Sequence, residues 1–107
     1  MNEAALQVTV AAASREEAER ITRTAVDRRL AACGQVIGPV YSTYRWEGRI
    51  EQAEEWLCLL KTTGARHTEL ERAIRALHSY QNPEIVATAI VHASDDYLAW
   101  LRTETTA

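Results

Sequence analysis

The chain has 107 residues, 47% of them hydrophobic, and a formal net charge of −3. This length predicts one domain, residues 1–107, which buries about two thirds of the surface that the unfolded chain exposes. The negative net charge and the lack of a segment rich in Lys and Arg argue against nucleic acid and anionic membranes as partners. No apolar run approaches the roughly 20 residues of a membrane span, so we expect a cytoplasmic protein.

The first third of the chain predicts a strand followed by a helix. Residues 4–12, "AALQVTVAA", have the composition of a short strand. Ser14, with Glu17 three residues later, forms a capping-box pattern that begins an amphipathic helix. We expect this helix to end near Cys33, with Gly34 as a left-handed C-cap.

The middle of the chain predicts one long β-hairpin. Residues 36–46 form a strand pattern, interrupted at Gly38-Pro39, where proline predicts a bulge or an edge strand. Glu47-Gly48 is a two-residue turn, and residues 49–63 return as the partner strand. The outer half of this return is charged and its inner half is apolar, so we expect only the inner half to be buried.

The last third predicts a helix, a strand and a terminal helix. Residues 65–78 carry apolar side chains at helical spacing, and Asn82-Pro83 cannot continue that helix. Residues 83–91 read as a fourth strand, and Ser94 or Asp95 caps the final helix. The resulting order, βαββαβ with a C-terminal helix, predicts an α+β sandwich of the ferredoxin-like class.

The predicted hairpin is longer than the domain that carries it. About 14 residues of strand extend ~45 Å, whereas a compact domain of this size is roughly 35 Å across. Tyr41, Tyr44 and Trp46 lie toward the overhanging end, where nothing else in the chain is left to cover them. Exposed strand edges and aromatic patches mark interfaces, so we expect a homo-oligomer.

The two cysteines are predicted to be free thiols. If Trp46 faces Arg49, Cys58 lies opposite Ile37, at least ~13 Å from Cys33 along the strand, which is too far for a disulfide. Cys58 stands in an apolar run and is best explained as a small core residue. Cys33 is either a packing residue or a ligand for a soft metal ion.

Four polar residues stand where strands and the second helix meet their loops: Lys61, His78, Tyr80 and Glu84. Together they would suit a small anion or acid–base chemistry. The alternative is a Lys61–Glu84 ion pair beside a hydrogen-bonded Tyr80, with His78 capping its helix. Because no nucleophile triad, phosphate loop or paired-acid motif is present, we do not predict an enzyme.

Several stretches together resemble a known family. They are "RLAACGQVIGPVYSTYRWEG", then "KTT", "HSYQNPEIVA" and "DYLAWL". Their order and spacing resemble the signature stretches of the CutA family, the divalent-cation tolerance proteins, over nearly the whole chain. The resemblance implies a ferredoxin-like subunit in a tightly packed homotrimer, in which Tyr41, Tyr44 and Trp46 make the trimer contacts.

The resemblance also implies binding of copper or a similar metal ion, with Cys33 and His78 as ligands and no other cofactor. Three positions depart from the family pattern. Ser79 stands where the family usually has proline, Leu77 stands where some members have a second histidine, and the first strand lacks a cysteine. A site of Cys33 and His78 alone would be incomplete unless neighbouring subunits added ligands.

A cleft between subunits is the second site that the resemblance implies, and Lys61, Tyr80 and Glu84 match its residues. Trimeric PII-type signalling proteins are similar in architecture and bind ligands in such clefts. The alternative function is therefore a PII-like regulatory module that binds a small anion near Lys61.

Overall fold

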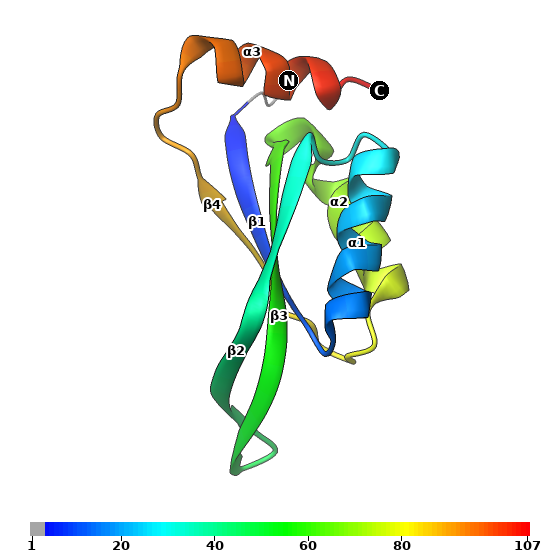
Figure 1. Ribbon diagram of the computed structural model, residues 1–107, viewed down its shortest axis with the longest axis vertical. Helices are drawn as coiled ribbons and strands as arrows, with labels where there is room; N and C mark the ends of the chain where they lie inside the picture. The colour runs from blue at the N-terminus through cyan, green and yellow to red at the C-terminus, as the bar shows by residue number, and fades with distance from the viewer. Residues whose placement is uncertain (1–3) are drawn as a thin grey trace.

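The computed structural model describes residues 4–107 (Figure 1). The predicted order of strands and helices is confirmed. It runs β1 (Ala5–Ala12), α1 (Arg15–Asp27), β2 (Cys33–Trp46), β3 (Arg49–Thr63), a short 3-10 helix (Gly64–Arg66), α2 (His67–Leu77), β4 (Ile85–Ala89) and α3 (Asp95–Glu104). Within this range no helix is both long and apolar enough to cross a membrane.

The four strands form one antiparallel sheet in the order β2-β3-β1-β4. Helices α1 and α2 cover one face of it, and α3 lies across one end (Figure 1). The main core joins Val8 of β1 and Leu60 of β3 to Ile21 of α1 and to Leu70 and Ile74 of α2, all of them buried. This arrangement is the ferredoxin-like sandwich that the sequence predicts.

Helix α1 begins as predicted, with the Ser14 hydroxyl accepting a hydrogen bond from the Glu17 N–H at 3.1 Å. Its predicted end is wrong, because the helix stops at Asp27 and the left-handed residue is Arg29, with φ 58°. The N–H groups of Arg29 and Leu30 donate to the carbonyls of Val26 and Ala25, which is a Schellman ending. An arginine seldom adopts this conformation, so composition alone does not reveal it.

Gly34 lies inside β2 and serves packing instead. A Cβ atom there would come within 2.6 Å of side-chain carbons of both Leu60 and Thr22. Glycine therefore lets the start of β2 approach α1 closely.

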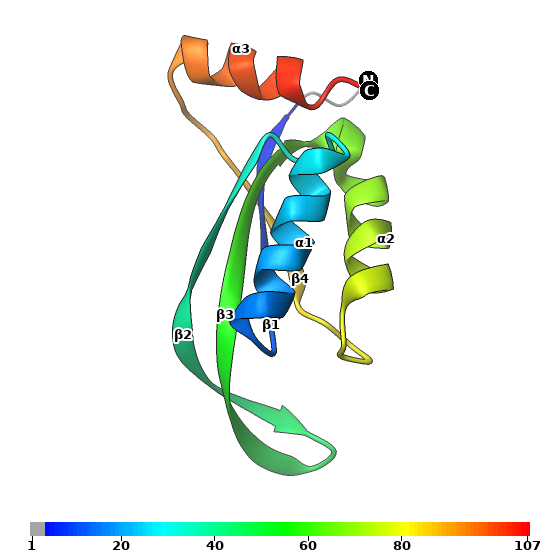
Figure 2. The same ribbon diagram turned by 45° about the vertical axis from the view of Figure 1, so that its right-hand side comes forward.

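The hairpin overhangs the globule as predicted, since the longest axis of the molecule is 44 Å and the other two are 25 and 23 Å. Its turn places Glu47 and Gly48 at positive φ, 50° and 78°. Most of the outer half of β3 is exposed, whereas Cys58 and Leu60 of the inner half are fully buried. The end of the hairpin bends under the helix layer (Figure 2).

The predicted bulge at Gly38-Pro39 is confirmed, because the register of β2 against β3 shifts between Ile37 and Val40. The shift changes one predicted pair: Cys58 lies opposite Val36 rather than Ile37. Both cysteines are free, as expected.

The last strand is shorter than predicted and ends at Ala89, although the Ile90 N–H still donates to the Ala5 carbonyl. Ser94 is the N-cap of α3, accepting a hydrogen bond from the Tyr97 N–H. Leu101 is fully buried in a small second cluster with Ala5 and Ala32. This cluster fixes α3 against the end of the sheet.

Candidate functional site

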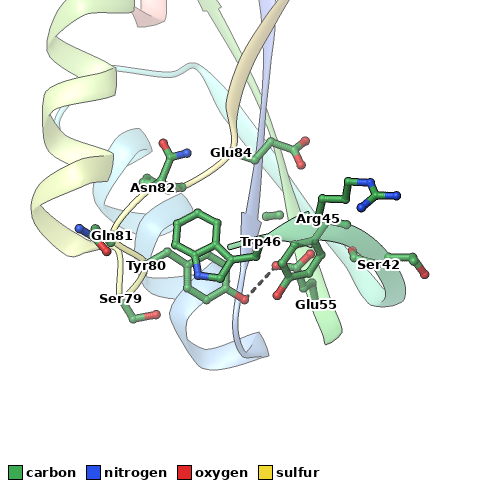
Figure 3. A pocket seen from close by; sticks show the side chains of 13 residues that line it. Ser42, Arg45, Trp46, Glu55, Ser79, Tyr80, Gln81, Asn82 and Glu84 are labelled. Atoms are coloured by element: carbon green, nitrogen blue, oxygen red, sulfur yellow. Dashed lines mark hydrogen bonds between the residues drawn. The ribbon is translucent and has the colours of Figure 1, made fainter. Parts of the chain in front are cut away.

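A cavity of about 790 Å³ lies between the outer part of the hairpin and the loop that joins α2 to β4. It is lined by residues 42–46 of β2, Glu55 of β3, residues 79–84 and Ala11 of β1. Figure 3 shows the loop residues facing the hairpin residues across this space. Its volume is in the range of small-molecule sites.

A partly buried hydrogen bond in the cavity wall joins Tyr80 to Glu55. The Tyr80 hydroxyl donates to Glu55 Oε2 at 2.8 Å, and Glu55 is only 7% exposed. Burial and this hydrogen bond together raise the pKa of Tyr80 well above its usual value of 10. Tyr80 is therefore a phenol that donates a hydrogen bond at neutral pH. The alternative prediction of a hydrogen-bonded Tyr80 is confirmed.

His78 holds the loop that carries Tyr80. Its Nδ1 accepts the Tyr80 N–H at 3.0 Å, and its Nε2 lies 2.8 Å from the Ala11 carbonyl oxygen. A backbone N–H only donates and a carbonyl only accepts, so the ring is neutral with its proton on Nε2. Both nitrogens are in use, and a metal ion would have to displace one of these partners.

Glu17 fixes the same loop from the other side. Its Oε1 accepts the Ala13 N–H at 3.0 Å and its Oε2 accepts the Ser79 N–H at 2.9 Å. In a standard capping box this carboxylate would return to the Ser14 N–H. Here it connects the start of α1 to the loop 62 residues later.

Cys33 and Lys61 lie at the opposite end of the sheet from His78. They face each other across β2 and β3. The Cys33 Sγ is 3.4 Å from the Tyr97 hydroxyl oxygen, a contact that helps to raise the pKa of Tyr97 to about 12. Lys61 Nζ donates to Gln35 Oε1 at 3.0 Å.

The structure therefore does not bring Lys61 together with Tyr80 and Glu84 within one subunit. Lys61 is opposite Gln7 of β1, whereas Glu84 directly precedes Ile85, which is opposite Val10. This offset corresponds to roughly 10 Å or more along the strands. Neither Lys61 nor Glu84 has an ion-pair partner in the part of the chain that is described, so the alternative Lys61–Glu84 pair is wrong.

The predicted metal ligands are likewise apart. Between residues 4 and 107, no three His, Cys, Asp or Glu side chains gather closely enough to hold a metal ion. Cys58 is buried, lies 3.3 Å from the Ala18 carbonyl, and has a pKa raised by that burial. It is the core thiol that the sequence predicts.

Two features of the site were not predicted from the sequence. Glu55 stands at the end of a charged stretch, and only its position on the side of β3 that faces the cavity distinguishes it from its neighbour Glu54. Tyr44 and Trp46, predicted as trimer contacts, also form one wall of the cavity, whereas Tyr41 lies outside it and is 80% exposed.

Known proteins match this chain over almost its full length. The family model described as CutA1 divalent ion tolerance protein matches residues 6–104. The divalent-cation tolerance protein CutA of Thermus thermophilus is 40% identical over 98 residues, which are 92% of this chain and 95% of that protein. A solved structure of a Thermus thermophilus divalent cation tolerance protein has a TM-score of 0.93 at 38% identity, covering 95% of this chain and 99% of that chain.

A solved CutA structure from Archaeoglobus fulgidus has a TM-score of 0.92 at 33% identity and covers 95% of this chain and 99% of that chain. The fold is thus an α+β ferredoxin-like sandwich shared with solved CutA proteins. The chain belongs to the CutA1 divalent ion tolerance family. The Archaeoglobus protein is named as periplasmic, and the cytoplasmic location of this chain stays a prediction.

Proposed function

We propose that this protein acts in divalent-cation tolerance as a homotrimer and is not an enzyme. The family membership supports the role, and the hairpin supports the oligomer. Tyr41 and Ile50 are 80% and 63% exposed on a hairpin that extends beyond the globule. Large apolar side chains on an overhanging two-stranded ribbon require cover, and a second and third copy of the chain supply it.

The oligomer is tested by gel filtration with light scattering. The proposed trimer has three times the subunit mass of 12.0 kDa. Trp46→Ala should loosen it, whereas Trp100→Ala should not, because Trp100 is equally exposed, 42% against 41%, but lies on α3. A folded monomer of the unchanged chain would contradict the proposal.

For the metal, we propose Cys33 as the copper ligand contributed by each subunit. Its thiol is partly exposed and its hydrogen-bond partner is the Tyr97 hydroxyl. Thiolate sulfur suits Cu(I). We leave His78 out of this proposed site, because within its own subunit both of its nitrogens are hydrogen-bonded and it lies at the other end of the sheet. Further ligands would come from neighbouring subunits.

Titration of Cu(I) and Cu(II), each against a competing chelator, tests this assignment. Cys33→Ser should lose tight binding, and Cys58→Ser serves as the matched control because Cys58 is buried. His78→Ala should retain copper affinity while it loses stability. Equal binding by the unchanged protein and Cys33→Ser would refute the copper assignment.

The alternative of a PII-like module that binds a small anion is not favoured. Lys61 is bonded to Gln35 and lies away from the cavity. The cavity itself is lined by the carboxylates of Glu55 and Glu84. These groups repel an anion.

A further inference from the structure

The cavity between the hairpin and the loop at residues 79–84 contains a buried negative charge. Glu55 is 7% exposed, and its Oε2 accepts the Tyr80 hydroxyl. Among residues 4–107, no basic side chain lies within ion-pair distance of Glu55. A buried carboxylate without a cation is costly, because one neutral hydrogen bond replaces little of its hydration. The site therefore favours a cation supplied from outside the subunit.

The remaining charges in the cavity wall agree with this. Glu84 adds a second carboxylate, and Arg45 is the one basic residue that lines the cavity among residues 4–107. Arg45 is exposed, and its guanidinium points away from the hydrogen bond between Tyr80 and Glu55 (Figure 3). The inner end of the cavity thus keeps its negative charge.

Aromatic rings supply the other wall. Tyr44, Trp46 and Tyr80 all line the cavity. Tyr44 and Trp46 are partly exposed and stack on no other ring of the described chain, so no ring of the same subunit covers their faces. Aromatic faces attract organic cations, and tryptophan attracts them most strongly.

We propose that this cavity binds an organic ammonium ion, with Glu55 as the counter-charge and Trp46 and Tyr44 as the aromatic wall. A bare metal ion fits less well, since the described residues bring no three acidic, histidine or cysteine side chains together. An ammonium ion needs only one carboxylate and the ring faces. This binding goes beyond the proposed metal-tolerance role and does not depend on Cys33.

Because Tyr44 and Trp46 are also the predicted trimer contacts, the experiment uses the intact oligomer. Isothermal titration calorimetry at low salt would measure binding of tetramethylammonium and n-butylammonium, with inorganic phosphate as the anionic probe. Glu55→Gln should weaken ammonium binding tenfold or more. The amide oxygen can still accept the Tyr80 hydroxyl, which preserves the fold. Trp46→Leu, measured on the fraction that light scattering shows to be trimeric, should weaken binding severalfold.

Glu54→Gln is the matched control, because Glu54 is the neighbouring acid, is exposed and does not line the cavity. It should leave ammonium affinity within about twofold, and Cys33→Ser should also leave it unchanged. Three results would overturn the proposal. The first is that the unchanged protein binds neither ammonium probe at millimolar concentration. The second is that Glu54→Gln weakens binding as much as Glu55→Gln does, and the third is that Glu55→Gln dissociates the oligomer. The last result would assign the missing cation to a neighbouring subunit.

Discussion

The Glu17 carboxylate is the group whose replacement tests most directly how the cavity loop is held. Glu17 is 5% exposed and accepts two backbone N–H groups, one from Ala13 and one from Ser79. In Glu17→Gln the amide oxygen can accept only one of them, and the NH2 group faces the other donor. Losing a charged hydrogen bond and leaving a donor unsatisfied should lower the free energy of unfolding by about 2–3 kcal/mol at pH 7.

The pH dependence of this effect has a definite sign. Burial alone would raise the pKa of Glu17, but hydrogen bonds from Ala13 and Ser79 outweigh it and lower the pKa below its ordinary value of 4.5. A carboxylate with a lowered pKa in the folded state stabilises the protein above its unfolded pKa, and this stabilisation is lost as pH falls through the folded pKa. The difference between the unchanged protein and Glu17→Gln should therefore be largest near pH 7 and shrink below about pH 4.5.

Urea unfolding followed by tryptophan fluorescence measures this difference, with subunit concentration held constant because an oligomer's stability depends on it. Glu16→Gln is the control, since Glu16 is in the same helical turn but exposed. Either of two results would refute the account of the loop anchor. The first is that Glu17→Gln lowers the free energy of unfolding at pH 7 by no more than Glu16→Gln does. The second is that Glu17→Gln lowers it by no more at pH 7 than at pH 3.5.

Three further changes probe the fold. Gly34→Ala should destabilise by about 1–3 kcal/mol in urea unfolding, because the added Cβ overlaps side chains of Leu60 and Thr22. Gly48→Ala should cost only about 1 kcal/mol, since its Cβ meets nothing within 4 Å and the cost is the positive φ alone. Leu101→Ala should cost about 2–5 kcal/mol and increase hydrogen exchange in α3, because this fully buried side chain anchors that helix.

For each of these three predictions, one result would contradict the reasoning. Stabilisation by Gly34→Ala would mean that the start of β2 has room for a side chain. Gly48→Asn should recover much of what Gly48→Ala loses, because asparagine tolerates positive φ, and equal losses would contradict the turn geometry. Faster hydrogen exchange spread over the whole sheet in Leu101→Ala would show that α3 is not a separate unit.

Local sequence signals account for most of the fold. Ser14 and Ser94 begin their helices, Glu47-Gly48 makes the hairpin turn, and Gly38-Pro39 marks the bulge. Each depends on the backbone preference or hydrogen bonding of one or two adjacent residues. The end of α1 was missed for the same reason, because the left-handed position is held by Arg29 and no local preference indicates it.

The candidate site depends on contacts that local patterns do not contain. His78 and Tyr80 were predicted near a site, but the partners that give them their roles, Ala11 and Glu55, lie 67 and 25 residues away in the chain. Strand register places Lys61 opposite Cys33 at the far end of the sheet, where its Nζ donates to Gln35 Oε1.

The sequence by itself determined the order of elements, the turn, the two free thiols and the family. Only the tertiary structure decided that Cys33 and His78 are apart, that both nitrogens of His78 are in use, and that the buried charge of Glu55 faces a cavity. The physical reason is that propensities and caps act over a few residues, whereas a site is made where packing brings distant segments within hydrogen-bond distance.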